Sequence, residues 1–318
     1  MSYSLDGGPE QTATNPASVS ISGDAVHLLT YHSTDLATNA ETAKSLEIKI
    51  DSTPPNVTAS CSPAPNANGW NNTDVLVTFH ADDALSGVAQ LDAPMLVTEE
   101  GAGVTCSGSA TDAAGNVDTV TVTMNIDKTA PVVSGSVATI PVYTDGSGNE
   151  WFAGDAQVAY TARDDISGLQ SPTAAGSGVE INVNHTVTGE GAGLSDSLSV
   201  TDKADNSATA TVSGINIDRT GPTITITGVT NGATYPLGGA PTPAYSAVDG
   251  LSGLKTSYAN LQGPGTASGA GVYIYTVNAE DNVGNRSSVV VTYSVVYPTF
   301  VGILQPINLD GSSIFKLG

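Results

Sequence analysis

One unit recurs along this chain, and its length limits what the chain can fold into. Each copy begins with Asp-x-Thr-x-Pro, which occurs at Asp51, Asp127 and Asp218, so the unit repeats after 76 and then 91 residues. Units of this length are too long for a propeller blade or a solenoid coil. They suit an immunoglobulin-like β-sandwich of about seven short strands.

Three further motifs follow each junction in a fixed order: an acidic turn, a Gly-rich step and a turn that pairs Asp with Asn. Short runs such as residues 117–126 alternate apolar residues with Thr and Ser, which is typical of half-exposed strands. The predicted class is therefore all-β. The acidic turns are residues 81–87, 162–168 and 247–253, the Gly-rich steps are residues 100–103, 190–193 and 268–271, and the Asp/Asn turns are residues 111–116, 201–206 and 279–285.

The repeat predicts five parts, of which we call the first four modules 1 to 4. Module 1 (1–50) carries only the second half of the unit, and modules 2 (51–126), 3 (127–217) and 4 (218–296) are complete. Residues 297–318 depart from the repeat and are interpreted as the start of a further module or an extended tail. We expect this sequence to be a piece of a longer protein that starts inside a module.

The junctions leave almost no linker between modules. Proline fixes its own backbone angle and restricts the residue before it, so each junction is expected to be stiff. The predicted architecture is a series of tandem immunoglobulin-like β-sandwich modules that form an elongated rod.

The charge balance excludes one class of partner. The chain has 31 acidic and 9 basic residues, a formal net charge of -22, which repels phosphate backbones and makes nucleic acid an unsuitable partner. Hydrophobic residues make up 39%, too many for a disordered acidic tail. No run of about 20 apolar residues is present, so we expect no membrane segment in this piece, and any export signal or anchor outside it.

The acidic loops predict calcium as a cofactor, because calcium prefers six to eight oxygen ligands from carboxylates, Asn side chains and backbone carbonyls. In each module, we expect the acidic turn to meet the junction aspartate. The alternative is that Asp and Asn serve only as turn formers, since their side chains bond to nearby backbone amides. The predicted ligands are Asp51 with Asp82 and Asp83, Asp127 with Asp164 and Asp165, and Asp218 with Asp249.

Module 2 holds both cysteines of the chain, Cys61 and Cys106. No CxxC pair or His/Cys cluster accompanies them, which argues against zinc and favours a disulfide between them. The alternative is a pair of small buried thiols.

Other residues are candidates for packing or modification. Trp70 and Trp151 precede the second strand of their modules and are interpreted as packing residues. The histidines fall at unrelated positions and no G-x-S-x-G motif is present, so the chain is predicted not to be an enzyme. Candidate glycosylation sequons occur at Asn56, Asn71, Asn184 and Asn285.

These motifs resemble those of bacterial and archaeal extracellular immunoglobulin-like repeat proteins over nearly the whole chain. The segments IDSTPPNVTASC and EEGAGVTCSGSATDAAGNV carry this resemblance. The opening YSLDGG resembles an OmpL47-type repeat, and FVGILQPINLDGSSIFKLG resembles the beginning of a PxKF-type module. The resemblance implies a secreted or cell-surface location, as in adhesins, surface-layer proteins and accessory regions of large secreted hydrolases.

The leading functional hypothesis is a structural or adhesive stalk that calcium makes rigid. Its expected partners are neighbouring modules or copies of itself, together with an unknown surface or glycan ligand. One alternative is a set of spacer modules in a large extracellular enzyme whose catalytic domain lies elsewhere. Another is a subunit of an extracellular filament, in which the tail of one molecule adds a strand to the next.

Overall fold

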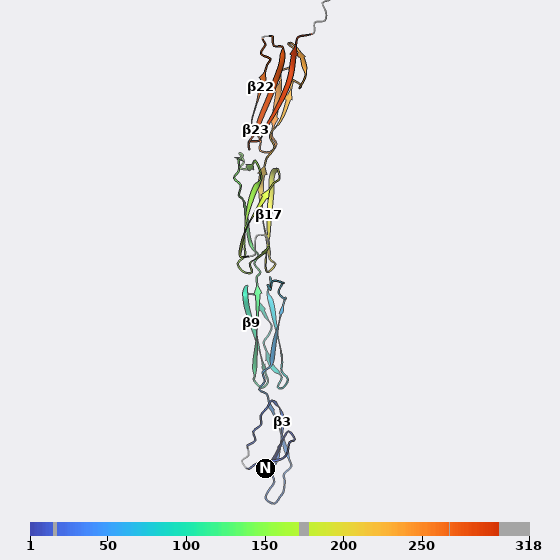
Figure 1. Ribbon diagram of the computed structural model, residues 1–318. Helices are drawn as coiled ribbons and strands as arrows, with labels where there is room; N and C mark the ends of the chain where they lie inside the picture. The colour runs from blue at the N-terminus through green and yellow to red at the C-terminus, as the bar shows by residue number, and fades with distance from the viewer. Residues whose placement is uncertain (15–17, 172–177, 267, 299–318) are drawn as a thin grey trace, which may run out of the picture. The chain divides into compact units, whose positions relative to one another are not determined.

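The computed structural model describes residues 1–14, 18–171, 178–266 and 268–298 (Figure 1). Every regular element among them is a β-strand, so the predicted all-β class is confirmed. Accordingly, this part of the chain contains no helix with the length and apolarity that a membrane crossing needs. Most of the predicted tail, residues 299–318, lies outside the described residues.

The chain packs into two compact units. The first combines residues 1–133, 161–182 and 199–209, and the second combines residues 134–160, 183–198 and the chain from Ala210 onward. This division does not follow the module borders predicted from the repeat. The names of modules 1 to 4 are kept below for their residue ranges.

Module 1 forms one antiparallel sheet in the order β2-β1-β3-β4. Leu5 lies opposite Leu29, which in turn lies opposite Leu46, so these side chains share one face of the sheet. The strands are β1 (Ser2–Leu5), β2 (Gln11–Thr12), β3 (Ala25–His32) and β4 (Lys44–Ile50).

Module 2 has two three-stranded sheets, β5-β6-β8 and β10-β9-β7. Alternate residues of β6 are buried, and its Phe79 packs so closely on β9 that a Cβ atom on Gly108 would lie 2.5 Å from the ring. The strands are β5 (Asn56–Ser62), β6 (Val75–Asp82), β7 (Val88–Leu91), β8 (Met95–Val97), β9 (Gly101–Asp112) and β10 (Val117–Ile126). The core contains Val75, Val77, Phe79, Cys106, Met124 and Ile126.

Module 3 has sheets in the orders β11-β14-β16 and β12-β13-β18-β17-β15. Trp151 in β13 is 6% exposed, as expected for a packing residue, and it pairs in parallel with Asn216 of β18. The strands are β11 (Val132–Val137), β12 (Tyr143–Thr144), β13 (Glu150–Phe152), β14 (Ala156–Arg163), β15 (Leu169–Ser171), β16 (Glu180–Val187), β17 (Gly191–Asp202) and β18 (Ser207–Ile217).

Module 4 combines the pair β19-β21 with the sheet β20-β24-β23-β22. Its core is partly aromatic, because Tyr293 stacks on Tyr273 at 5.2 Å and meets Tyr235 edge-on at 5.8 Å. The strands are β19 (Thr223–Thr227), β20 (Thr234–Pro236), β21 (Ala244–Val248), β22 (Leu254–Gln262), β23 (Gly271–Asp281) and β24 (Arg286–Val296).

Candidate metal centres

Three aspartates meet at each of the three junctions. In each group, one carboxylate oxygen per residue lies within 4.8 Å of the others. Each group takes one member from the junction, one from the acidic turn and one from the Asp/Asn turn. The groups are Asp51, Asp83 and Asp112; Asp127, Asp164 and Asp202; and Asp218, Asp249 and Asp281. We call them clusters 1, 2 and 3.

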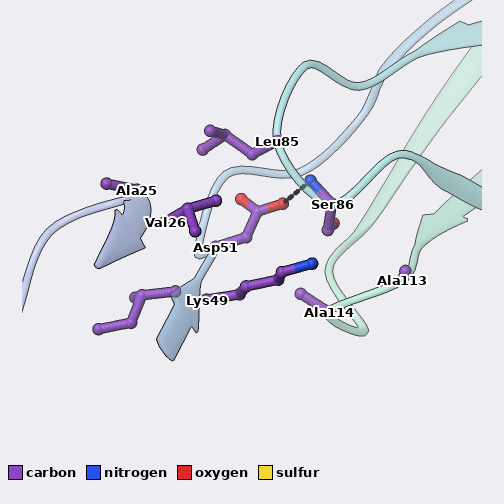
Figure 2. A pocket seen from close by; sticks show the side chains of 9 residues that line it. Ala25, Val26, Lys49, Asp51, Leu85, Ser86, Ala113 and Ala114 are labelled. Atoms are coloured by element: carbon purple, nitrogen blue, oxygen red, sulfur yellow. Dashed lines mark hydrogen bonds between the residues drawn. The ribbon is translucent and has the colours of Figure 1, made fainter. Parts of the chain in front are cut away.

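The junction aspartate holds two segments of backbone at once. In cluster 1, Asp51 Oδ1 accepts a hydrogen bond from the backbone N–H of Thr53 at 3.1 Å, and Oδ2 accepts one from Ser86 at 3.0 Å (Figure 2). The first bond closes an Asx-type turn at the start of the junction motif. The second ties the junction to the acidic turn. Asp127 binds Thr129 and Ser167, and Asp218 binds Thr220 and Ser252, in the same way.

The acidic turn uses only one oxygen of its aspartate. Asp83 Oδ1 accepts the backbone N–H of Gly87 at 2.6 Å, and Gly87 has φ of +79°, a left-handed conformation that favours glycine. The Oδ2 atom accepts no hydrogen bond from the described residues. The same holds for Asp164, which binds Gly168, and for Asp249, which binds Gly253.

The Asp/Asn turn locks its two side chains together. Asp112 Oδ1 accepts the backbone N–H of Asn116 and Oδ2 accepts its side-chain Nδ2, both at 2.8 Å. The same Nδ2 donates to the backbone carbonyl of Asp51 at 3.2 Å. Asn206 and Asn285 repeat this arrangement toward Asp127 and Asp218. The turn is thus fixed against the junction in all three copies.

Burial and like charge set the electrostatics of the clusters. All three members of cluster 2 are buried, whereas clusters 1 and 3 contain half-buried members. Burial raises the pKa of Asp202, and the negative charge of Asp127 raises it further. The hydrogen bonds from Asn206 act to lower this pKa but do not outweigh the two raising effects. Burial also acts to raise the pKa of Asp112, but the hydrogen bonds from Asn116 and its turn outweigh it and leave that pKa lowered.

The carboxylates of the clusters are not neutralised by any cationic side chain in the described part of the chain. Among the described residues, none of the nine aspartates forms an ion pair. Carboxylates held this close favour either a shared proton or a bound cation. A carboxylate oxygen also has two lone pairs, so one that accepts an N–H can still bind an ion.

A buried hydroxyl beside cluster 3 lacks a partner. Ser252 is 6% exposed, and its Oγ atom makes no hydrogen bond among the described residues. Its backbone N–H is the group that binds Asp218. An orphaned hydroxyl in a polar site is one place where an additional ligand can bind.

Two of the predicted ligands lie outside the clusters. The clusters also contain three aspartates that were not predicted from the sequence. Asp82 ends β6 as an exposed residue, because neighbouring positions of an extended chain point to opposite sides. Asp165 is exposed and pairs with Arg163 at 2.8 Å. The missed residues are Asp112, Asp202 and Asp281, and their signal was the repeated Asp-x-x-x-Asn spacing.

Acidic residues on the other side of each junction hold the linker itself. Glu100 accepts a hydrogen bond from the backbone N–H of Lys128, whose Nζ lies 2.8 Å from Asp74. Arg219 repeats this pattern, because it binds Glu190 through its backbone at 3.0 Å and Asp155 through its side chain. The glutamate of the Gly-rich step thus helps to fix the junction.

Beside cluster 1, an open cavity of about 330 Å³ reaches Asp51 (Figure 2). It gives solvent, and so a dissolved ion, access to this junction. Its lining includes Val26 and Lys49 of module 1 and Leu85, Ser86 and Ala114 of module 2.

Cys61 and Cys106 are both free in the structure, so the predicted disulfide is not formed there. Cys61 nevertheless packs against the core cluster that contains Cys106. The bridge stays a prediction.

The four sequons differ in accessibility. Asn71 is 5% exposed and donates to the carbonyl of Pro63, and Asn285 is held by cluster 3. Asn56 and Asn184 are exposed on strands β5 and β16. Only the latter two could accept a glycan without local unfolding.

Comparisons with known proteins identify no family for this chain. No protein-family model matches the chain, and no curated protein does. The OmpL47-type and PxKF-type resemblances therefore stay predictions.

Several solved structures are similar to this chain. One is described as "tetra-tandem repeat in extending region of large adhesion protein", with 16% identity, coverage of 93% of this chain and 92% of that chain, and a TM-score of 0.33. Another covers "Protocadherin Gamma B2 extracellular cadherin domains 1-5", with 12% identity, 87% and 66% coverage and a TM-score of 0.31. A third concerns "a 1.5-MDa bacterial ice-binding adhesin", with 15% identity, 78% and 100% coverage and a TM-score of 0.28. Because every TM-score is below 0.5, these likenesses carry no argument about function.

Proposed function

We propose that this chain is a non-catalytic stalk, structural or adhesive, of a secreted or cell-surface protein, and that calcium binds at its module junctions. One observation carries the proposal: the same three-aspartate cluster, with the same hydrogen bonds, occurs at three successive junctions. The partners of each module are its neighbours in the chain.

The chemistry of the clusters suits calcium. Each offers three carboxylates, and the turn aspartate keeps one oxygen that accepts no hydrogen bond from the described residues. Calcium takes six to eight oxygens and tolerates irregular geometry, so water and backbone carbonyls can complete the set. A divalent cation would also remove the repulsion among the three negative charges.

The position of the clusters supports a mechanical role. The junction aspartate, the acidic turn and the Asp/Asn turn are bonded to one another, and an acidic residue of the preceding module holds each linker. All three aspartates of a cluster belong to one module, whose first residue is the junction aspartate. An ion bound there would hold the junction residue to the turns of its module and would stabilise the folded module by mass action.

Thermal unfolding of the full chain in calcium and in chelator tests the proposal. The triple variant Asp83→Asn, Asp164→Asn, Asp249→Asn keeps the Oδ1 bonds and removes one charge per cluster. We expect calcium to raise the unfolding temperature of the wild-type chain and to raise that of the variant far less. The double variant Asp82→Asn, Asp165→Asn is the matched control and should respond as the wild type does. An equal calcium response in all three chains would contradict the assignment.

A further inference from the structure

A loop of module 2 reaches across the junction to module 3. Asn66 Nδ2 donates to the backbone carbonyl of Lys203 and to Asp205 Oδ2, both at 2.8 Å. Asn68 Nδ2 donates to the same carbonyl at 3.0 Å and to Gln170 Oε1 at 2.8 Å. Two side-chain amides thus make four hydrogen bonds to the Asp/Asn turn and to strand β15 of the next module.

The loop is shaped to present these amides. Asn66 Oδ1 accepts the backbone N–H groups of Asn68 at 3.0 Å and Trp70 at 3.1 Å. The oxygen of the amide is therefore used inside the loop, and its nitrogen is left to donate outward. This fixes the orientation of the side chain, since only the nitrogen can supply N–H groups.

Module 3 has a matching loop that lacks the donor. Asp145 stands in the place of Asn66 and accepts the backbone N–H groups of Ser147 and Asn149, both at 2.9 Å, with the same local shape. Its second oxygen accepts Asn149 Nδ2. A carboxylate has no N–H to donate. In agreement, no described residue of module 4 forms a hydrogen bond with residues 145–149.

The receiving turn also departs from the repeat. Asp205 has φ of +71°, a left-handed conformation that is unfavourable for a residue with a side chain. Modules 2 and 4 place Gly115 and Gly284 at this position of the Asp/Asn turn. Module 3 thus keeps a strained aspartate at the point where its carboxylate meets Asn66.

We propose that Asn66 and Asn68 with Lys203, Asp205 and Gln170 form a calcium-independent latch that fixes module 2 to module 3. The inference rests on the proposed function, because it distinguishes one junction from two others that depend on the ion. In each hydrogen bond of the latch, a side-chain amide donates to the Lys203 carbonyl, the Gln170 amide oxygen or the Asp205 carboxylate. None of these bonds needs a cation. In chelator, the stalk therefore keeps modules 2 and 3 as one rigid segment and bends at the other two junctions.

Residual dipolar couplings of the full-length, isotope-labelled chain in chelator test the latch, because modules that move together share one alignment tensor. We expect modules 2 and 3 to share a tensor while modules 1 and 4 align separately. Asn66→Asp copies the residue of module 3, keeps the loop shape and should abolish the shared tensor. Asn72→Asp adds the same charge at an exposed position of module 2 and should leave it intact.

Asp205→Gly separates the latch from general stability. It introduces the residue used in modules 2 and 4 and relieves the left-handed strain, so module 3 should stay folded and be at least as heat-stable. This variant also removes the carboxylate that accepts a hydrogen bond from Asn66, so the alignment tensors of modules 2 and 3 should become less similar. Separate tensors for modules 2 and 3 in the wild type, or equal behaviour of Asn66→Asp and Asn72→Asp, would overturn the latch. An absence of any calcium effect would instead contradict the proposed function alone.

Discussion

The side-chain amide of Asn206 donates to the backbone carbonyl of Asp127 at 2.9 Å, across 79 positions of sequence. The same nitrogen donates to Asp202 Oδ2 at 2.8 Å. One amide thus joins the junction to the turn that completes cluster 2. Its counterparts Asn116 and Asn285 do the same at the other two junctions.

Removing this amide should weaken module 3. Asn206→Ala removes the side-chain donor to Asp202 Oδ2, in a buried carboxylate, and to the Asp127 carbonyl, which costs about 1–3 kcal/mol of unfolding free energy. Urea unfolding followed by the fluorescence of the buried Trp151 measures the loss. Asn184→Ala, at an exposed strand position, should change stability by no more than about 0.5 kcal/mol. Equal effects of the two variants would contradict the role of Asn206.

The contact between β6 and β9 predicts a steric defect. In Gly108→Ala, the new methyl group would lie 2.5 Å from the Phe79 ring, and overpacking of this kind costs about 1–3 kcal/mol. Gly146→Ala is the control, because no atom lies within 4 Å of its added Cβ. Adding Phe79→Leu to Gly108→Ala should recover part of the stability in chemical unfolding. A neutral Gly108→Ala would show that the two sheets are less closely packed.

Module 1 should show a pH dependence of its own. The hydrogen bond that His27 donates to the Asp6 carboxylate at 2.8 Å raises the pKa of His27 above its usual 6.5, and a second bond to the carbonyl of Gly23 adds to this. The bond from His27, with one from the Leu28 N–H, lowers the pKa of Asp6 below its usual 3.8. The His27 contribution to stability is present below pH 6.5 and is lost as the pH rises through the raised value. The Asp6 contribution is lost as the pH falls through its lowered value.

Proton NMR of the His27 ring checks this pH dependence. The midpoint should exceed 6.5 in the wild type and should fall in Asp6→Asn, because that variant removes the carboxylate. A His27 midpoint that does not move in Asp6→Asn would refute the pairing.

The thiols of module 2 allow a direct test of the predicted disulfide. Cys106 is 5% exposed and burial raises its pKa, whereas Cys61 is half-buried, so Cys61 should react faster with a thiol reagent. Mild oxidation of the full chain should join the two, because Cys61 packs against the cluster that holds Cys106. Such a bridge is expected to add about 4 kcal/mol of stability. Peptide mapping that finds both thiols free after oxidation would remove the disulfide from the account.

Much of the fold could be predicted from the sequence because the repeat fixed the order of motifs. The alternation of apolar residues in segments such as 117–126 predicted the strands, and the junction motif located Asp51, Asp127 and Asp218. Periodicity does not tell at which end of a sandwich a turn lies. The position of Asp112 beside Asp51 depends on the full length of β9 and could be seen only in the structure.

Other site details depend on single side chains. Asp82 and Asp83 are neighbours with the same chemistry, and only the strand direction decides that Asp83 faces the junction. The latch was beyond sequence reasoning too, since Asn66 and Asp145 occupy the same loop shape and differ only in whether they can donate. The ability to donate has a consequence only where a turn of the next module lies within hydrogen-bond distance, and the sequence does not show this.

Calorimetric titration of the full chain with calcium, after removal of bound metal, tests the central claim most directly. We predict saturable binding of three ions per chain, and a loss of one ion in each of Asp83→Asn, Asp164→Asn and Asp249→Asn. Binding that is absent, or that stays the same in all three variants, would contradict it and leave the aspartates as turn formers that hold the junctions through hydrogen bonds alone.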